Sequence, residues 1–548
     1  MKKGYFAVLV GFSILLPFLI ISPNPFGNSP DVIVDESYFL SSALASIEHK
    51  TLSGFDFSPS GAYYGGVQTY LVTAAAAAAL AVILGVTGSV SATKLYVATH
   101  IGSLTHLVRV VNGLVVVLGL WLLLWWTYRK TSREFFWKAV LFVVLILGNS
   151  LFMSMVHTGK VWVIQMAAET AAAFLVILRE GGYIKRGYVL GLLTLTVAAA
   201  SQTVTGIFTG IWLVYGFYLK HFSLKELWAK IKIFTPFAIL AGVLQISVFY
   251  RGWHIANRIS STLTNINGTA FKDEQGLDWF KRIAWPIQVA FESQPFLVIG
   301  FVILCGYWLV FRRSNFIKNR MLHIGIFHSF FILTVFHALF GLGFLYRLVL
   351  PLTIAFSISL VLLLPAEKFW RVGALSFALI LAIFVTFHTE RLWWQPASER
   401  QLTAVVLSEY NNPNIAIFVR TPRFHFPTNT LSLDYLSPKE KTFGRFSYLL
   451  EHKEELERVE AFKSLSIKYL STTTARYGDF KGFKIFELLD GCENLCSERE
   501  LSIGRCRNVG SEICVNGKAQ YPHEVSTIGG LAKAKILGRP FALRQISE

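Results

Sequence analysis

The sequence predicts a polytopic α-helical membrane protein that ends in a small α/β domain. Of 548 residues, 53% are hydrophobic and only 15% are charged, whereas an average soluble protein carries roughly 25% charged residues. Long apolar runs alternate with short polar breaks from Met1 to about His388. A soluble fold could not hide this much apolar surface, and a chain this apolar cannot stay disordered in water.

Basic residues set the predicted orientation. The net charge is +18, but Lys and Arg fall between the apolar runs, which indicates cytoplasmic turns and not nucleic acid binding. The clusters are Arg129/Lys130/Arg133/Lys138, Arg179/Lys185/Arg186, Lys220/Lys225/Lys230/Lys232, Arg312/Arg313/Lys318/Arg320 and Lys368/Arg371. Lys2 and Lys3 precede the first run, 5–21, which we interpret as an uncleaved span with a cytoplasmic N-terminus. A cleaved signal peptide is the alternative, but no clear small-residue cleavage pattern follows the run.

The first outer loop and the first basic cluster lie on opposite sides of the membrane in this prediction, so an odd number of crossings must separate them. Two apolar runs, 67–86 and 108–127, lie between the first outer loop and the first basic cluster, where only an odd number of crossings fits. We expect 108–127 to cross and 67–86 to lie along or dip into the outer interface. A third short crossing at 92–107 is the alternative, but ionisable side chains in and beside that segment make it costly.

The remaining runs bring the prediction to about eleven transmembrane helices. Further spans are expected near 138–155, 162–178, 188–203, 205–219, 233–250, 295–311, 321–340, 345–364 and 372–388. The transmembrane domain therefore covers 1–388, with its first outer loop at 23–107. An odd count leaves residues 389–548 outside the cell as an extracytoplasmic soluble domain.

That tail reads as a mixed α/β domain. Alternating apolar residues predict strands at Asn414–Arg420 and Gly482–Glu487, and Glu451–Lys463 reads as a charged helix. Its four cysteines suggest two disulfides in an oxidising compartment. A zinc site and free thiols are the alternatives, although the spacing lacks a paired CxxC. These cysteines are Cys492, Cys496, Cys506 and Cys514, and the fifth, Cys305, is expected in the core of a span.

Candidate chemistry gathers at the predicted outer face. Asp35 and Glu36 stand at or near a helix start in the first outer loop, where the helix dipole favours a charged carboxylate that could act as a base. Arg109 begins a crossing helix at its outer end. The very short second outer turn, residues 157–162, carries His157 and Lys160, and Arg347 opens a later span. Solvated loop carboxylates and interfacial anchors are the alternative interpretation. An anionic lipid head group would suit these cations, because phosphate oxygens match arginine geometry.

Four short motifs resemble the GT-C superfamily of membrane glycosyltransferases, and in particular its protein O-mannosyltransferase and lipid A aminoarabinose transferase branch. Asp35-Glu36-Ser37-Tyr38 stands where the family has an Asp-Glu-x-Tyr loop motif. The segment 63–70 leads an apolar juxtamembrane stretch, as in the family. The segments starting at Arg109 and at Tyr346 resemble the family's Arg-Leu-x-Ser-Ala-Leu and Arg-Tyr-x-Leu-Pro helices.

The resemblance implies an integral membrane glycosyltransferase that moves a sugar from a polyprenyl-phosphate donor to an acceptor hydroxyl on a protein, lipid or glycan. Asp35, or else Glu36, would take the hydroxyl proton. Arg109, Arg347, Lys160 and His157 would hold the donor phosphate. Tyr38, Tyr63, Tyr64 and Gln68 would bind substrate.

No cofactor is expected, because the second outer turn has no carboxylate of the kind that metal-dependent relatives use. The leaving phosphate needs no general acid, and inversion at the anomeric carbon is expected. The main rival hypothesis is a transporter or lipid flippase, which Glu169 inside a span would favour. A non-catalytic membrane assembly subunit is a third.

Overall fold

The computed structural model describes a helical bundle and the sheet of the tail. The described ranges are 10–13, 67–90, 101–158, 182–184, 231–244, 279–311, 349–365, 367–394, 415–419, 430–432, 469–472, 484–490, 506–509, 519–520, 526–533, 536–537 and 541–546, with single residues elsewhere.

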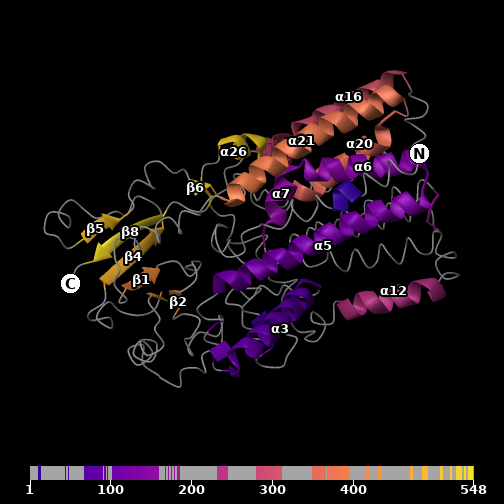
Figure 1. Cartoon of the computed structure of the whole chain (residues 1–548). Helices are drawn as coiled ribbons and strands as arrows, with labels where there is room; N and C mark the ends of the chain where they lie inside the picture. Colours follow the sequence, from indigo (N-terminus) through magenta and orange to yellow (C-terminus); the bar gives the residue numbers. More distant parts are fainter. Residues whose placement is uncertain are drawn as a thin grey trace.

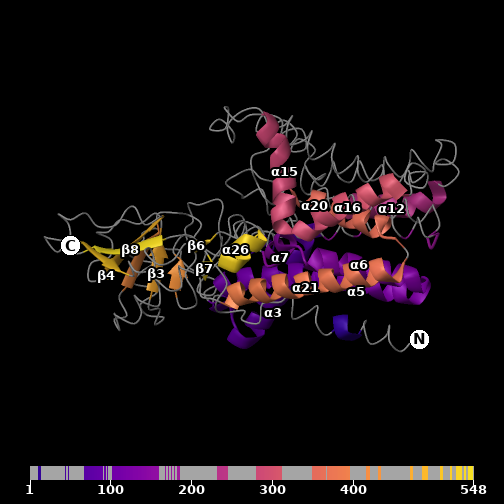
Figure 2. The ribbon, with the colours of Figure 1, turned by 90° about the horizontal axis from the view of Figure 1, so that it is seen from above.

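Within these ranges the bundle is built from nine helices. They are α3 (Val67–Thr87), α5 (Ile101–Lys130), α6 (Arg133–Leu147), α7 (Ser150–Val156), α12 (Ile231–Leu244), α15 (Trp279–Ser293), α16 (Pro295–Phe311), α20 (Leu350–Leu363) and α21 (Lys368–Trp394). The long helices α5, α6 and α21 run side by side (Figures 1 and 2).

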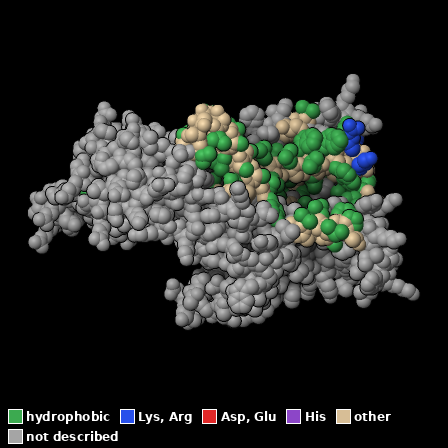
Figure 3. Space-filling model, turned by 90° about the horizontal axis from the view of Figure 1, so that it is seen from below, with side chains coloured by type: hydrophobic (Ala, Val, Ile, Leu, Met, Phe, Trp, Pro, Cys, Tyr) green, Lys and Arg blue, Asp and Glu red, His purple; other side chains and the backbone are tan. Residues whose placement is uncertain are grey.

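Three of these helices, α3, α5 and α21, are long and apolar enough to cross a membrane, and the count rises to five if two bent helix pairs are each one span. Large apolar side chains such as Val310 (73% exposed) and Phe369 (81% exposed) point outward, as they do toward lipid. Hydrophobic side chains cover the described helices on the face in Figure 3, and Lys and Arg gather at the end away from the strands. The chain is a polytopic helical membrane protein, and the total of eleven spans remains a prediction.

Helices occur where several spans were predicted. The predicted crossing at 108–127 lies inside α5, and 295–311 coincides with α16. The described part of the first run, residues 10–13, contacts α5, because Trp121 Nε1 donates a hydrogen bond to Ser13 Oγ at 2.5 Å. The length and hydropathy of α3 suit a membrane span. That this segment lies along or dips into the outer interface stays a prediction.

The predicted span 138–155 is broken. α6 and α7 meet at an angle of 74°, with Gly148 and Asn149 between them. Asn149 caps α7 by accepting a hydrogen bond from the Phe152 amide at 2.9 Å. A Cβ on Gly148 would lie 3.1 Å from Gln294 Nε2 and 3.4 Å from the Ala382 backbone nitrogen. Glycine therefore allows the bend to sit directly against α21.

A second bend joins α15 to α16 at 112°. No span is predicted over α15, whose segment contains Lys281, Arg282 and Glu292. Pro295 stands at the first position of α16, where its missing N–H leaves no hydrogen bond unmade.

The tail forms a six-stranded mixed sheet with the order β2-β3-β1-β4-β8-β5. Its strands are β1 (Ile415–Val419), β2 (Thr430–Ser432), β3 (Tyr469–Thr472), β4 (Lys484–Asp490), β5 (Cys506–Val509) and β8 (Phe541–Ile546). β2, β3, β1 and β4 are parallel, and β8 is antiparallel to β4 and β5. The strands predicted at 414–420 and 482–487 are confirmed as β1 and β4. The charged helix predicted at 451–463 lies outside the described residues.

A short helix of the tail docks on the bundle. α26 (Ile528–Lys533) contacts α21 and α15, and its Leu531 is 1% exposed within the main hydrophobic core. The small sheet of β6 (Ala519–Gln520) and β7 (Ile536–Leu537) lies between α26 and the larger sheet (Figure 2). α21 itself runs on to Trp394, past the domain boundary predicted at residue 388.

Candidate active site

Buried polar groups join the two bent helix pairs at the end of the bundle that faces the sheet (Figure 2). Gln294, in the bend between α15 and α16, donates from Nε2 to the Leu145 carbonyl at 2.9 Å. The Ser150 hydroxyl at the start of α7 lies 3.0 Å from the Ser293 carbonyl. It also contacts the carbonyl of Ser526 in the tail. These hydrogen bonds tie the two bends and the tail into one polar joint.

A hydrogen-bonded histidine–glutamate pair lies beside this joint. His157 follows α7, and its Nε2 lies 2.9 Å from Oε1 of Glu390, which stands near the end of α21. The His157 side chain is 1% exposed and that of Glu390 is 16% exposed. His157 is therefore buried between α7 and α21 and is not an exposed anchor, and its position at the outer end of the bundle stays a prediction.

The imidazole of His157 has an oxygen acceptor at each nitrogen. Nδ1 lies 2.9 Å from the Met153 carbonyl, and a carbonyl can only accept, so Nδ1 carries a proton. Nε2 faces the Glu390 carboxyl group. Either the ring carries both protons, or the carboxyl group of Glu390 carries the proton between them. Both arrangements hold one proton on the hydrogen bond that joins α7 to α21.

Arg109 is buried in the part of α5 that contacts the turn after α7. It stands in the first third of α5 and is 6% exposed. Asn112, one helical turn further along α5, donates from Nδ2 to the Thr158 carbonyl at 3.4 Å. Because Thr158 directly follows His157, this hydrogen bond places the Arg109 turn of α5 against the turn that carries His157. The guanidinium of Arg109 is therefore buried in protein and does not face bulk lipid.

Some buried polar atoms at this end have no hydrogen-bond partner within the described residues. They are Asn149 Nδ2, Gln294 Oε1 and Thr389 Oγ1. Native proteins rarely leave such groups unsatisfied. Thr389 is next to Glu390 in α21, so this end of the bundle has polar capacity for water or a polar ligand.

Of the predicted site residues, Arg109 and His157 lie on segments that the Asn112–Thr158 hydrogen bond joins, and Glu390 contacts His157. Gln68 lies in the first turn of α3, which packs against α5. The acidic pair was predicted to begin a helix, and Ala43 and Leu44 downstream are helical and buried. The other predicted site residues lie outside the described part: Asp35, Glu36, Tyr38, Tyr63, Tyr64, Lys160 and Arg347.

Two further expectations concern metals and cysteines. Among the described residues no three His, Cys, Asp or Glu side chains are placed to share a metal ion, and the expectation of a metal-independent site stays a prediction. The second outer turn has no carboxylate of its own, but its His157 contacts the carboxylate of Glu390 on α21. Cys506 lies on β5, and its predicted partners Cys492, Cys496 and Cys514 are outside the described residues.

Comparisons with known proteins found similarity in structure only. No protein-family model and no curated protein matches the chain. The structure is similar to crystal structures of ArnT from Cupriavidus metallidurans. The form bound to undecaprenyl phosphate has a TM-score of 0.45, 10% identity, and coverage of 92% of this chain and 95% of that chain. The apo form has a TM-score of 0.49, 10% identity, and coverage of 92% and 94%.

ArnT is a lipid A aminoarabinose transferase of the GT-C class, the class that the four sequence motifs resemble. Both TM-scores are below 0.5.

Proposed function

We propose that this chain is an integral membrane glycosyltransferase that transfers a sugar from a polyprenyl-phosphate donor to an acceptor hydroxyl at the extracytoplasmic face. The observation that carries the proposal is the burial of Arg109 at the start of the apolar length of α5, in the part of the helix that contacts the turn after α7. Phosphate oxygens match the geometry of an arginine guanidinium. We therefore infer that Arg109 contributes positive charge for a lipid-linked phosphate at this depth.

The orientation follows from the basic residues. Arg129 and Lys130 end α5, Arg133 begins α6 and Lys368 begins α21, all at the end of the bundle away from the sheet. The positive-inside rule assigns that end to the cytoplasm. The Arg109 end and the tail then face the outside, where lipid-linked sugar donors meet their acceptors.

The chemistry divides among a few residues. Asp35 removes the proton from the acceptor hydroxyl as that oxygen attacks the anomeric carbon. Arg109, with Arg347 and Lys160, stabilises the charge that develops on the leaving phosphate. His157, which binds Glu390, positions the second outer turn. One carboxylate base suffices because the phosphate leaves as a stable anion, and a single displacement inverts the anomeric carbon.

The distribution of charge favours this enzyme over a transporter. α5 has no charged residue between Arg109 and Arg129, and α21 has none between Arg371 and Glu390. Secondary transporters place their ionisable groups near the bilayer midplane, whereas these charges lie at the helix ends. Glu169, the residue that favours a transporter, lies outside the described part.

Binding of the lipid carrier tests the proposal. Undecaprenyl phosphate, the ligand of the ArnT crystal structure, would be titrated into the purified protein and compared with undecaprenol, which has the same chain and no phosphate. We expect undecaprenyl phosphate to bind at least about tenfold more tightly, since charge-assisted hydrogen bonds depend on the phosphate. Equal binding of the two lipids would contradict the proposal.

A further inference from the structure

A second charged site lies at the end of the bundle opposite to Arg109. A cavity of about 460 Å³ opens between the first turns of α6 and α21 and the turn that follows α20. Four cations line it, namely Arg133, Lys138, Lys368 and Arg371, together with one carboxylate, Glu134. Two basic clusters from distant parts of the sequence thus meet around one cavity, which we call the basic cavity.

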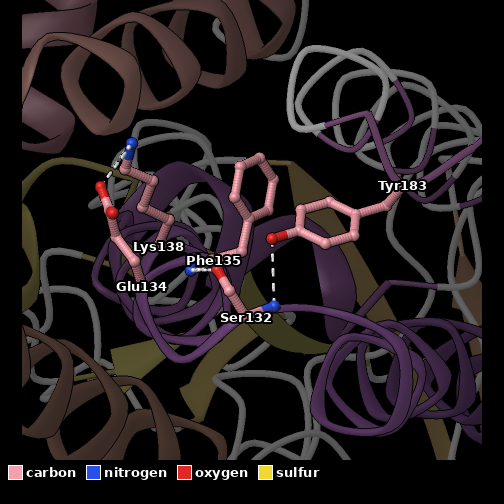
Figure 4. Close-up of polar contacts among 5 residues, drawn as sticks. All are labelled: Ser132, Glu134, Phe135, Lys138 and Tyr183. Carbon is pink, nitrogen blue, oxygen red and sulfur yellow. Dashed lines mark hydrogen bonds and ion pairs between the residues drawn. The ribbon is translucent and has the colours of Figure 1, made fainter.

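Cations outnumber carboxylates in the lining of the basic cavity by four to one. Glu134 pairs with Lys138 at 3.4 Å (Figure 4). Neither Lys368 nor Arg371 has an ion-pair partner within the described part of the chain. α6 and α21 also direct their N-terminal ends here, and the helix dipole makes each end partly positive. The basic cavity therefore favours an anion.

The start of α6 is held in place. The Ser132 hydroxyl accepts a hydrogen bond from the Phe135 amide at 3.4 Å, and the Ser132 amide donates to the Tyr183 hydroxyl at 3.0 Å (Figure 4). The ring of Tyr183 packs edge-on against Phe135 with centroids 4.7 Å apart. Lys138, one turn further, is thus presented from a fixed helix start.

The inner wall of the basic cavity is apolar. Trp137, Leu141 and Leu375 line it beside the cations, and Leu141 is 3% exposed. A soluble anion would gain nothing from such a wall. A molecule with a phosphate and a hydrocarbon chain would use both parts, since the chain replaces water on the apolar side.

We propose that the basic cavity binds one anionic glycerophospholipid of the surrounding bilayer, with its phosphate on Lys368 and Arg371 and an acyl chain against the apolar wall. Basic pockets between helices at the cytoplasmic side recognise anionic head groups in this way. The site is separate from the one proposed for the sugar donor, because the two lie at opposite ends of α21.

The test is lipid binding to purified, delipidated protein, measured by native mass spectrometry with phosphatidylglycerol and with phosphatidylcholine. The wild type should bind phosphatidylglycerol first and more tightly. Changing Lys368→Gln and Arg371→Gln together should weaken phosphatidylglycerol binding by about tenfold or more, since each basic residue near the head group contributes several-fold, and leave phosphatidylcholine binding as it was.

Two controls make the result specific to the basic cavity. The pair Arg129→Gln and Lys130→Gln removes the same two residue types at the same end of the bundle but outside the cavity lining, and should change binding less than about twofold. The pair Lys368→Arg and Arg371→Lys keeps the charge and should keep binding. Thermal unfolding of every variant shows which are folded.

Three results would overturn the proposal. One is equal loss of phosphatidylglycerol binding in the Arg129/Lys130 control. Another is unchanged binding in the folded Lys368/Arg371 variant. The third is displacement of phosphatidylglycerol by millimolar glycerol 3-phosphate, because the site would then take a soluble phosphate and not a lipid.

Discussion

Replacing Glu390 measures how strongly α21 holds the turn that carries His157. Oε1 of Glu390 lies 2.9 Å from Nε2 of His157, and the side chains of Glu390 and His157 are 16% and 1% exposed. Losing a hydrogen bond to a charged group costs about 1.5–3 kcal/mol, and breaking a fully buried ion pair costs about 3–5 kcal/mol. Because Glu390 is partly exposed, water can replace part of it, and we expect Glu390→Ala to destabilise the protein by about 2–3 kcal/mol.

Glu390→Gln should cost less, because an amide N–H can donate to Nε2 while Nδ1 still donates to the Met153 carbonyl. The assay is reversible unfolding in mixed detergent micelles for the wild type, Glu390→Ala, His157→Ala and the double variant. The double-mutant cycle isolates the pair from the cavity that each truncation leaves. Arg391→Ala, the exposed neighbour on α21, is the control and should leave the unfolding midpoint unchanged. A coupling energy near zero would refute the inferred pair.

Three further predictions concern the donor site, the bend and the topology. Arg109→Ala and, separately, Arg347→Ala should weaken binding of undecaprenyl phosphate by about 2–5 kcal/mol, measured by titration, because each strips a buried charge of its partner; unchanged affinity would remove that residue from the site. Gly148→Ala should destabilise the protein by about 1–3 kcal/mol in the same unfolding assay, because a Cβ there meets Gln294 Nε2 at 3.1 Å. Gly119→Ala, with open space around it, should be neutral or stabilising, and equal effects would contradict the argument about the bend. A cysteine at the exposed Ala532, with the native thiols blocked, should react with an impermeant reagent on intact cells; labelling only after lysis would reverse the orientation.

The sequence could predict the parts of the fold that depend on which residues face lipid or water. Lipid requires long apolar helices, so the runs that form α5, α16 and α21 stand out in the sequence. Strands β1 and β4 were predictable because apolar residues alternate along them. The basic clusters were predictable for a similar reason, since Arg133 and Lys368 both lie at the end of the bundle away from the sheet, as their shared cytoplasmic assignment required.

Features that depend on contacts between distant segments could not be predicted. The bend is marked only by Gly148 and the capping residue Asn149 within an apolar run, and its angle depends on packing against α21, which a sequence does not show. Glu390 was assigned to the tail because it follows the last apolar run, and its partner His157 is 233 positions away in the sequence. The available signal was a carboxylate within the last turns of a span, which is costly unless it has a partner.

Turnover of a lipid-linked sugar donor by purified wild-type protein, Asp35→Asn and Glu36→Gln tests whether Asp35 is the base of a sugar transfer. The wild type should release polyprenyl phosphate and form a product with inverted anomeric configuration. Asp35→Asn keeps the shape of the side chain but cannot act as a base, and it should lower turnover by about 100-fold or more while donor binding persists. Glu36→Gln should lower turnover less. Full activity in Asp35→Asn would contradict the role of Asp35 as the base. No release of polyprenyl phosphate by the wild type with any acceptor tested would contradict the proposed glycosyltransferase activity.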